Sequence, residues 1–285
     1  NLWKLGKRKI PKRSDKLPQG MQSWLRFGLI LPVSLLTAVL FTTSRAGSSF
    51  NTQPADIPDS LRLEVNLGAG FSHLEKDDNL ISFPAVGIRF SSAGLVELQA
   101  DYEFLYRTRG NLSSVYGSGD LTLWTKVRFT SQNQNNLASF GLRFGVKLPN
   151  ANDKDGLGTD QTDFFAALLL SRKSEKFQGH INLGIAILDD PLKLRSQQDM
   201  MLLGLAGMYN ISPTLQIIAD FYTQQGASTR FRFSKAAFGA RFTNGNWGWQ
   251  AGVKKGIRAF DKGYQGEQSL DWGLMVGVSH CFEMN

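Results

Sequence analysis

From residue 61 to its end, the chain alternates apolar and polar residues in about twelve segments. The segment 270–282 shows this period most clearly: apart from His280, its even positions are large apolar residues, and its odd positions are mostly small or polar. A period of two over ten or more residues indicates a β-strand with one apolar face. These segments are longer than most strands of soluble sheets and match the roughly 9–11 tilted residues that cross a bilayer. The pattern favours a membrane barrel over a soluble sandwich.

The connections between the segments are alternately long and short, as in outer-membrane barrels with an even number of strands. A sheet in hydrocarbon must also close on itself, because an open edge would leave backbone groups unpaired. The sequence therefore predicts an all-β fold, a transmembrane antiparallel β-barrel of about twelve strands. The predicted strands are 61–71, 82–91, 95–107, 119–130, 137–148, 161–172, 177–188, 199–209, 214–224, 231–242, 247–257 and 269–282.

The first 46 residues are predicted to serve export. Residues 21–46 read as a cleavable signal peptide that starts at Met21, has an apolar core over 27–41 and ends at the cleavage site Ser44-Arg45-Ala46. A membrane-spanning helix is the alternative, but the core is short and contains Pro32. Residues 1–20 are interpreted as an upstream extension outside the native structure, and 47–285 as a single barrel domain. Residues 47–60 are too few for a folded plug, so we expect any gate to come from the loop 149–160.

Charge and cysteine content narrow the possible partners. Residues 1–46 contain nine Lys or Arg and one Asp, which accounts for the whole net charge of +8. The remainder is neutral, so the basic composition is no evidence for nucleic-acid binding. The single cysteine, Cys281, excludes an internal disulfide and a cysteine-based zinc site. We expect no metal and no cofactor.

Aromatic residues on the outward register gather near both ends of the predicted strands. Two such girdles are typical of membrane barrels, because amphipathic rings favour the membrane interface. One group lies beside the short turns: Phe90, Phe129, Phe177, Phe242, Trp247 and Phe282. The other lies nearer the long loops: Phe71, Phe104, Tyr106, Phe164, Phe221 and Trp272.

Three motifs suggest a family. The runs 117–123 (GSGDLTL), 141–150 (GLRFGVKLPN) and 156–164 (GLGTDQTDF) resemble the outer-membrane transporter family linked to the meta-cleavage pathway of phenol degradation. The resemblance covers about residues 60–282. Asn150 and Asp160 stand where that family more often has Gly, which implies a different shape for the loop between them. The resemblance implies a channel for hydrophobic or aromatic compounds, and it supports the architecture more strongly than the substrate.

Charged residues on the inward register are the candidate lining of a pore. They are Glu97, Asp101, Glu103, Lys126, Arg128, Arg143, Lys147, Lys235, Arg241 and Lys254. Acids and bases fall on neighbouring strands, which suits a charged, hydrated passage. The same arrangement suits a mutually paired network that fills the barrel and carries no solute. The loop aspartates Asp153, Asp155, Asp160 and Asp163 are the candidate gate; their spacing lacks the pattern of a calcium-binding EF-hand.

An enzymatic function would need a nucleophile and a base at the rim of the barrel. Only His73 lies in a predicted external loop, with Ser72 and Glu75 nearby. We therefore expect no catalytic residues and no enzyme, and an outer-membrane hydrolase ranks third among the functions considered.

The first function considered is a porin-like channel in the bacterial cell outer membrane for passive uptake or efflux of small hydrophobic or aromatic molecules. The second is a non-conducting structural or binding barrel with an ion-paired, plugged lumen. The expected partners are outer-membrane lipid, the barrel assembly machinery and a small-molecule solute of unknown identity, with no nucleic acid.

Overall fold

The computed structural model describes residues 50–74, 78–110, 114–133, 137–158, 161–189, 197–226, 232–258 and 270–284. They belong to a compact unit that spans residues 43–285. The predictions for residues 1–46, including cleavage after Ala46, lie outside the described residues. Among the described residues, no helix is long and apolar enough to cross a membrane.

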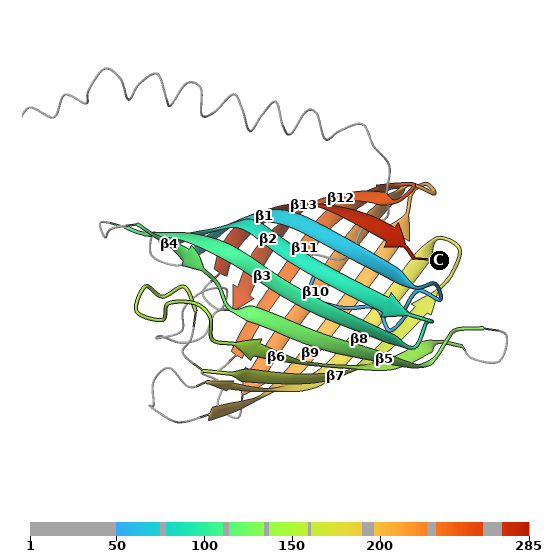
Figure 1. Ribbon diagram of the computed structural model, residues 1–285, viewed down its shortest axis with the longest axis horizontal. Helices are drawn as coiled ribbons and strands as arrows, with labels where there is room; N and C mark the ends of the chain where they lie inside the picture. Colours follow the sequence, from blue (N-terminus) through green and yellow to red (C-terminus); the bar gives the residue numbers. More distant parts are fainter. Residues whose placement is uncertain are drawn as a thin grey trace, which may run out of the picture. The chain divides into compact units, whose positions relative to one another are not determined.

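The structure consists of long antiparallel strands that follow one another around a closed wall (Figure 1). The strands are β1 (Arg62–Leu74), β2 (Asp78–Ser92), β3 (Val96–Arg109), β4 (Val115–Ser118), β5 (Leu121–Thr130), β6 (Ser139–Leu148), β7 (Asp163–Lys173), β8 (Phe177–Asp189), β9 (Gln197–Asn210), β10 (Leu215–Gly226), β11 (Arg232–Asn244), β12 (Trp247–Arg258) and β13 (Leu270–Glu283). The twelve predicted strands are confirmed, with ends shifted by a few residues.

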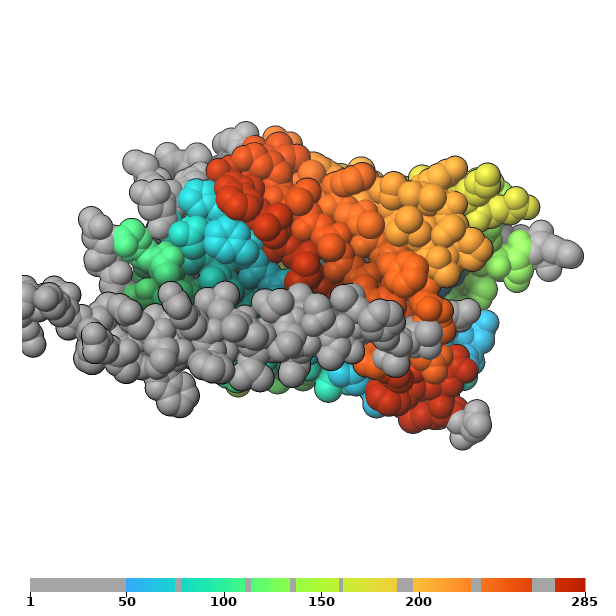
Figure 2. Space-filling model, turned by 90° about the horizontal axis from the view of Figure 1, so that it is seen from above, coloured from blue at the N-terminus to red at the C-terminus, as the bar shows by residue number. Residues whose placement is uncertain are grey.

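The barrel closes where its first and last strands meet. β1 pairs with β13 from Arg62 opposite Glu283 to Leu74 opposite Leu270, and β1 pairs with β2 on its other side. Figure 2 shows the red β13 against the blue and cyan segments of β1 and β2. Every long strand that the structure describes has two neighbours, so the wall closes on itself, as a sheet in hydrocarbon requires.

The predicted strand 119–130 corresponds to β5, and the short strand β4 that precedes it was not predicted. β4 pairs with the second half of β3 and β5 with the first half, so that β4 and β5 together fill one position of the twelve-stranded wall. The break falls at Gly119, whose amide donates to the Glu103 carbonyl (2.7 Å), and at Asp120. The Asp120 carboxylate accepts the amides of Asn150 (3.1 Å) and Ala151 (3.0 Å), so it holds the β6–β7 loop.

β2 is longer than predicted and contains a proline. β2 begins at Asp78, before the predicted start at Ser82, and continues through Pro84. The register shifts between Ser82 and Ala85, against both neighbouring strands. A bulge of this kind accommodates a proline, which has no N–H to donate to the ladder.

Burial across the wall is the reverse of that in a soluble protein. Large apolar side chains on the outer face are exposed, as in Leu183 (55%), Val253 (51%) and Val276 (54%). Charged side chains on the inner face are covered, as in Glu97 (6%), Lys126 (2%) and Asp220 (4%). An apolar outer face with a polar interior is the arrangement that a lipid environment stabilises.

The two ends of the barrel differ. At one, which we call the short-turn end, the strands are joined by brief turns, and the wall begins at Arg62 and ends at Glu283. At the other, the long-loop end, an apolar cluster inside the barrel joins Leu74, Ala186, Leu188, Met200, Phe233 and Leu270. Aromatic pairs on the outer face lie towards both ends, as in Phe129–Phe140 (5.6 Å) and Phe71–Trp272 (5.3 Å between ring centroids).

Candidate functional site: a lumen crossed by the N-terminal segment

Residues 50–60, which we call the N-terminal segment, lie inside the barrel. Phe50, Thr52, Gln53, Ala55 and Ile57 are all buried. Backbone amides of the segment donate to side chains of the wall: Thr52 to Asp220 Oδ2 (2.9 Å), Gln53 to Asn182 Oδ1 (2.7 Å) and Ala55 to Ser171 Oγ (2.7 Å). Asn182 Nδ2 also donates to the Gln53 carbonyl (2.8 Å), so this side chain pairs with the segment much as a neighbouring strand would.

Towards the short-turn end the segment is held mainly by charge. Lys173 forms an ion pair with Asp56 (3.0 Å), which also accepts the Ser139 hydroxyl. Arg128 donates to the Ile57 carbonyl (2.8 Å) and pairs with Asp59 (2.7 Å). Burial raises the pKa of Asp56, but the hydrogen bond from Ser139 and the charge of Lys173 lower it, and the net pKa lies below the ordinary value of 3.8. Asp56 is therefore held as a carboxylate.

One inward glycine, Gly204, makes room for the segment, because a Cβ on it would lie 2.7 Å from Thr52 Oγ1. Gly239 is close to the Phe50 ring, but a Cβ on it would first meet the Ala251 carbonyl oxygen of β12. The Phe50 ring packs with Met208, Ile218, Ala237 and Met275. The wall is thus shaped to the segment as well as bonded to it.

Residues 47–60 were expected to be too few for a folded plug, and the described part, residues 50–60, has no regular secondary structure, yet it lies inside the barrel. That reasoning assumed a plug with a core of its own, but an extended segment needs none when the wall supplies hydrogen bonds. The loop proposed instead as the gate, of which 149–158 are described, binds at the rim. Its carbonyls at Asp155 and Gly156 accept Arg109 (2.9 Å) and Arg107, and its Leu157 is buried.

Two chambers lie in the lumen beside the segment. The short-turn chamber, of about 930 Å³, is bounded by residues of the segment between Gln53 and Ser60 and by β1, β2, β3, β5, β7, β8, β9, β11 and β13. The long-loop chamber, of about 500 Å³, is bounded by Phe50, Asn51 and Gln53 and by strands that include β2, β3, β5 and β6. Gln53 and Arg89 line both, so the two chambers are neighbours that border these two side chains.

The predicted pore-lining residues divide among three places. Glu97, Lys126, Arg128 and Arg241 line the short-turn chamber. Asp101, Glu103 and Arg143 line the long-loop chamber. Lys147, Lys235 and Lys254 are not among the residues that line either described chamber.

The charged residues do not form the simple arrangement in which the acids of one strand face the bases of the next strand. Lys126 pairs with Glu97 (2.8 Å) within the wall, whereas Arg128 pairs with the N-terminal segment. Arg143 stacks on Trp124, with its guanidinium carbon 3.6 Å from the ring centroid, and donates to Gln99 (2.7 Å).

The remaining predicted lysines lie towards the long-loop end. Lys147 pairs with Asp120 (3.4 Å) and with Asp163, which is thus engaged at the start of β7. The Lys235 ammonium lies 6.0 Å from the Tyr222 ring centroid and 5.8 Å from that of Phe233, next to the apolar cluster.

The other aspartates of the predicted gate lie in or near the β6–β7 loop. Asp155 accepts a hydrogen bond from Asn152 Nδ2 (2.6 Å), and Asp153 lies in the same turn. Asp160 lies outside the described residues.

The histidines give no support to a hydrolase. Ser72 and His73 are consecutive on β1, so their side chains point to opposite faces, and Glu75 lies outside the described residues. A serine–histidine contact does exist between Ser171 Oγ and His180 Nδ1 (2.7 Å). However, Ser171 is buried behind the segment and already accepts the Ala55 amide, so this pair fixes the segment.

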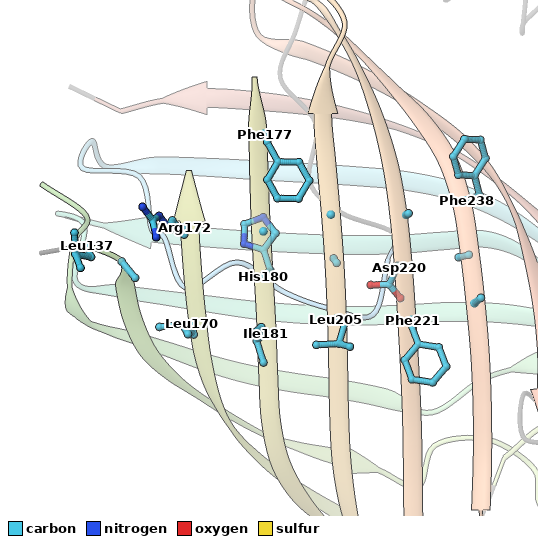
Figure 3. A pocket seen from close by; sticks show the side chains of 17 residues that line it. Leu137, Leu170, Arg172, Phe177, His180, Ile181, Leu205, Asp220, Phe221 and Phe238 are labelled. Atoms are coloured by element: carbon cyan, nitrogen blue, oxygen red, sulfur yellow. The ribbon is translucent and has the colours of Figure 1, made fainter. Parts of the chain in front are cut away.

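The outer wall carries an apolar groove of about 810 Å³ across β7–β11 (Figure 3). Its outward lining includes Phe177, Ile181, Leu205, Phe221 and Phe238, with small residues between them at Gly179, Gly207 and Ala219. His180 and Asp220 come from the same strands, but their polar contacts are with the lumen. The groove faces away from both chambers, so it is no part of a path through the barrel.

Comparison with known proteins shows the fold. No family model matches the chain, and no curated protein matches it. The structure is similar to the COG4313 outer membrane channel from Pseudomonas putida F1, at 14% identity and a TM-score of 0.61, over 84% of this chain and all of that one. It is also similar to the NanC porin, at 9% identity and a TM-score of 0.55, over 76% of this chain and 98% of that one. The chain therefore has the fold of outer-membrane channels.

Proposed function

We propose that this protein is a passive channel of the bacterial outer membrane for small solutes that combine an apolar or aromatic body with a polar group. The observation that carries the proposal is the pair of neighbouring chambers, both lined by Gln53 and Arg89, inside a closed wall with an apolar outer face. The N-terminal segment occupies the side of the lumen next to β5–β10. It narrows the lumen and leaves space on the side of β1–β3.

The lining of the lumen supports this kind of solute. Arg143 and Trp124 line the long-loop chamber and stack on each other, and this pair would favour a flat ring. The chambers themselves carry ion pairs and amides, which solvate polar groups. A solute with no polar group would lose that stabilisation inside the barrel.

A non-conducting barrel is the second candidate, and the buried Glu97–Lys126 pair favours it. Both side chains are almost fully covered, and pairs of this kind can fix the register of a structure without serving transport. In that case the N-terminal segment would occupy the lumen permanently and block the passage of solutes.

Swelling of proteoliposomes separates the two candidates. Vesicles that contain the purified protein should swell in isotonic solutions of small neutral sugars, at a rate that falls as the sugar becomes larger, and vesicles without protein should not. Protein that is folded in the vesicles, as judged by its heat-modifiable band, yet causes no swelling with any sugar would favour the non-conducting barrel.

A further inference from the structure

One cation in the short-turn chamber has no protein counterion. Arg241 makes no hydrogen bond and no ion pair with any residue that the structure describes, and its Nε and Nη2 are covered. The other charged side chains that line this chamber are matched in pairs: Lys126 with Glu97, Arg89 with Glu64, Arg128 with Asp59, Lys173 with Asp56 and Arg62 with Glu283. The lining therefore has one positive charge in excess.

The neighbours of Arg241 cannot supply the missing charge. On β11 it lies opposite Gln216 of β10 and Gln250 of β12, both neutral amides. The charged groups that act on it are Glu64 of β1 and Arg89 of β2, which are 3.4 Å apart and pair with each other. Two of the three guanidinium nitrogens are covered and lack an acceptor, which is costly, so an anion that reaches the half-buried group gains a strong, charge-assisted contact.

We propose that Arg241 is the binding site for a small organic carboxylate on its way through the short-turn chamber. This inference rests on the proposed channel function and names its class of solute. A single unmatched cation suits a single negative charge, because a dianion would leave one charge uncompensated in a covered site. The planar fork of a guanidinium matches a carboxylate in two parallel hydrogen bonds. Pro54, Ile57 and Met208 also line the chamber and would contact the apolar body of the solute.

The test compares sodium benzoate with benzamide, a neutral molecule of the same shape. Binding to detergent-solubilised protein is measured by calorimetry, and block of ion current is measured in planar bilayers with the same two probes. Arg241→Gln removes the fork and the charge, and Arg241→Lys keeps only the charge. Arg62→Gln is the matched control, because it removes one positive charge from the same chamber, but from a cation that is paired with Glu283 (3.4 Å).

We expect wild-type protein to bind benzoate and not benzamide. Arg241→Gln should weaken benzoate binding by about tenfold or more, the usual size of a lost hydrogen bond to a charged group. Arg241→Lys should fall between the two, and Arg62→Gln should stay within about twofold of wild type, since it leaves the fork intact. Equal losses of benzoate affinity in Arg241→Gln and Arg62→Gln would overturn the assignment. They would show that benzoate responds only to the net charge of the chamber.

The two readouts keep this inference apart from the proposed function. A protein that conducts ions, but that binds benzoate no more tightly than benzamide, would overturn the carboxylate site and leave the proposed channel function standing. Benzoate binding that requires Arg241, in a barrel that never conducts, would support the site and overturn the channel.

Discussion

Single residues of the wall determine whether the N-terminal segment can lie in the lumen. Thr52 packs against β9 where Gly204 leaves space, and its amide reaches the carboxylate of Asp220 on β10. Ser171 and Asn182 provide equivalent acceptors on β7 and β8. Each of these contacts contributes about 1 kcal/mol when considered alone. Together they fix an extended segment that has no fold of its own.

Replacing Gly204 should displace the segment. In Gly204→Val the new side chain would clash with Thr52, whose oxygen lies 2.7 Å from the position of a Cβ. Gly207→Val is the control, since it lies on the same strand but faces lipid, where the Phe177 ring is 3.4 Å away. We expect protease added at the short-turn side to cleave within residues 50–60 in Gly204→Val only, as mass spectrometry would detect. Equal protection of both variants would show that the segment adapts to the added bulk.

The contacts of single residues were only partly predictable. The period of two assigns each side chain to the inner or outer face, and this places Glu97, Asp101 and Arg143 in the lumen. It does not give their partners, because those depend on the register between strands and on segments without a period. Ser171, Asn182 and Asp220 were missed as site residues for this reason: their partner is an irregular segment more than 110 residues away in sequence. Their only sequence signal is a small or polar residue on the inward register.

At the scale of the elements, the N-terminal segment is the part whose attachment depends on pH. Asp56 is held below its ordinary pKa by Ser139 and Lys173, with His180 and Lys126 also facing this part of the segment. A carboxylate with a lowered pKa contributes stability that is complete above the unfolded-state value and is lost as the pH falls through the folded-state value. The attachment should therefore be constant at neutral pH and weaken only below pH 3.8.

Conductance measured at a series of pH values would test this attachment. In the wild type, single-channel conductance should be flat from neutral pH down to the ordinary carboxyl range and should rise below it, as Asp56 is protonated and the segment loosens. Asp56→Asn keeps an oxygen that can accept from Ser139 but loses the charge, so its conductance should be higher at neutral pH and should lack the acid-induced rise. An identical acid response in both proteins would assign it to another group.

The strands were predictable because each one has to satisfy the same condition, an apolar face towards lipid and a polar face towards the lumen. The exceptions are local. Asp120 binds the loop after β6, and it lies in the break between the unpredicted short strand β4 and β5. Pro84 lies within β2 because a bulge accommodates it. Neither the loop contact nor the bulge alters the alternation of apolar and polar residues, so the sequence pattern carries no signal of them.

At the scale of the whole molecule, the opposite chemistry of the two faces should appear in its stability. Val276 faces lipid near the middle of β13, whereas Asn66 on β1 faces the long-loop chamber. Val276→Arg should cost about 2–4 kcal/mol of folding free energy in lipid vesicles. Asn66→Arg should cost about 1 kcal/mol or less, because the chamber is polar and has space. Urea unfolding of both variants would check this, and equal losses would mean that the two faces are wrongly assigned.

The central claim is that a water-filled path runs past the N-terminal segment. It is tested most directly by single-channel recordings of the wild type and of a variant that lacks residues 50–57, each shown to be folded by its heat-modifiable band. We predict discrete, small conductance steps in the wild type and larger steps in the deletion variant, because the two chambers would then merge into one lumen. A folded wild-type barrel that shows no conductance steps would contradict the claim.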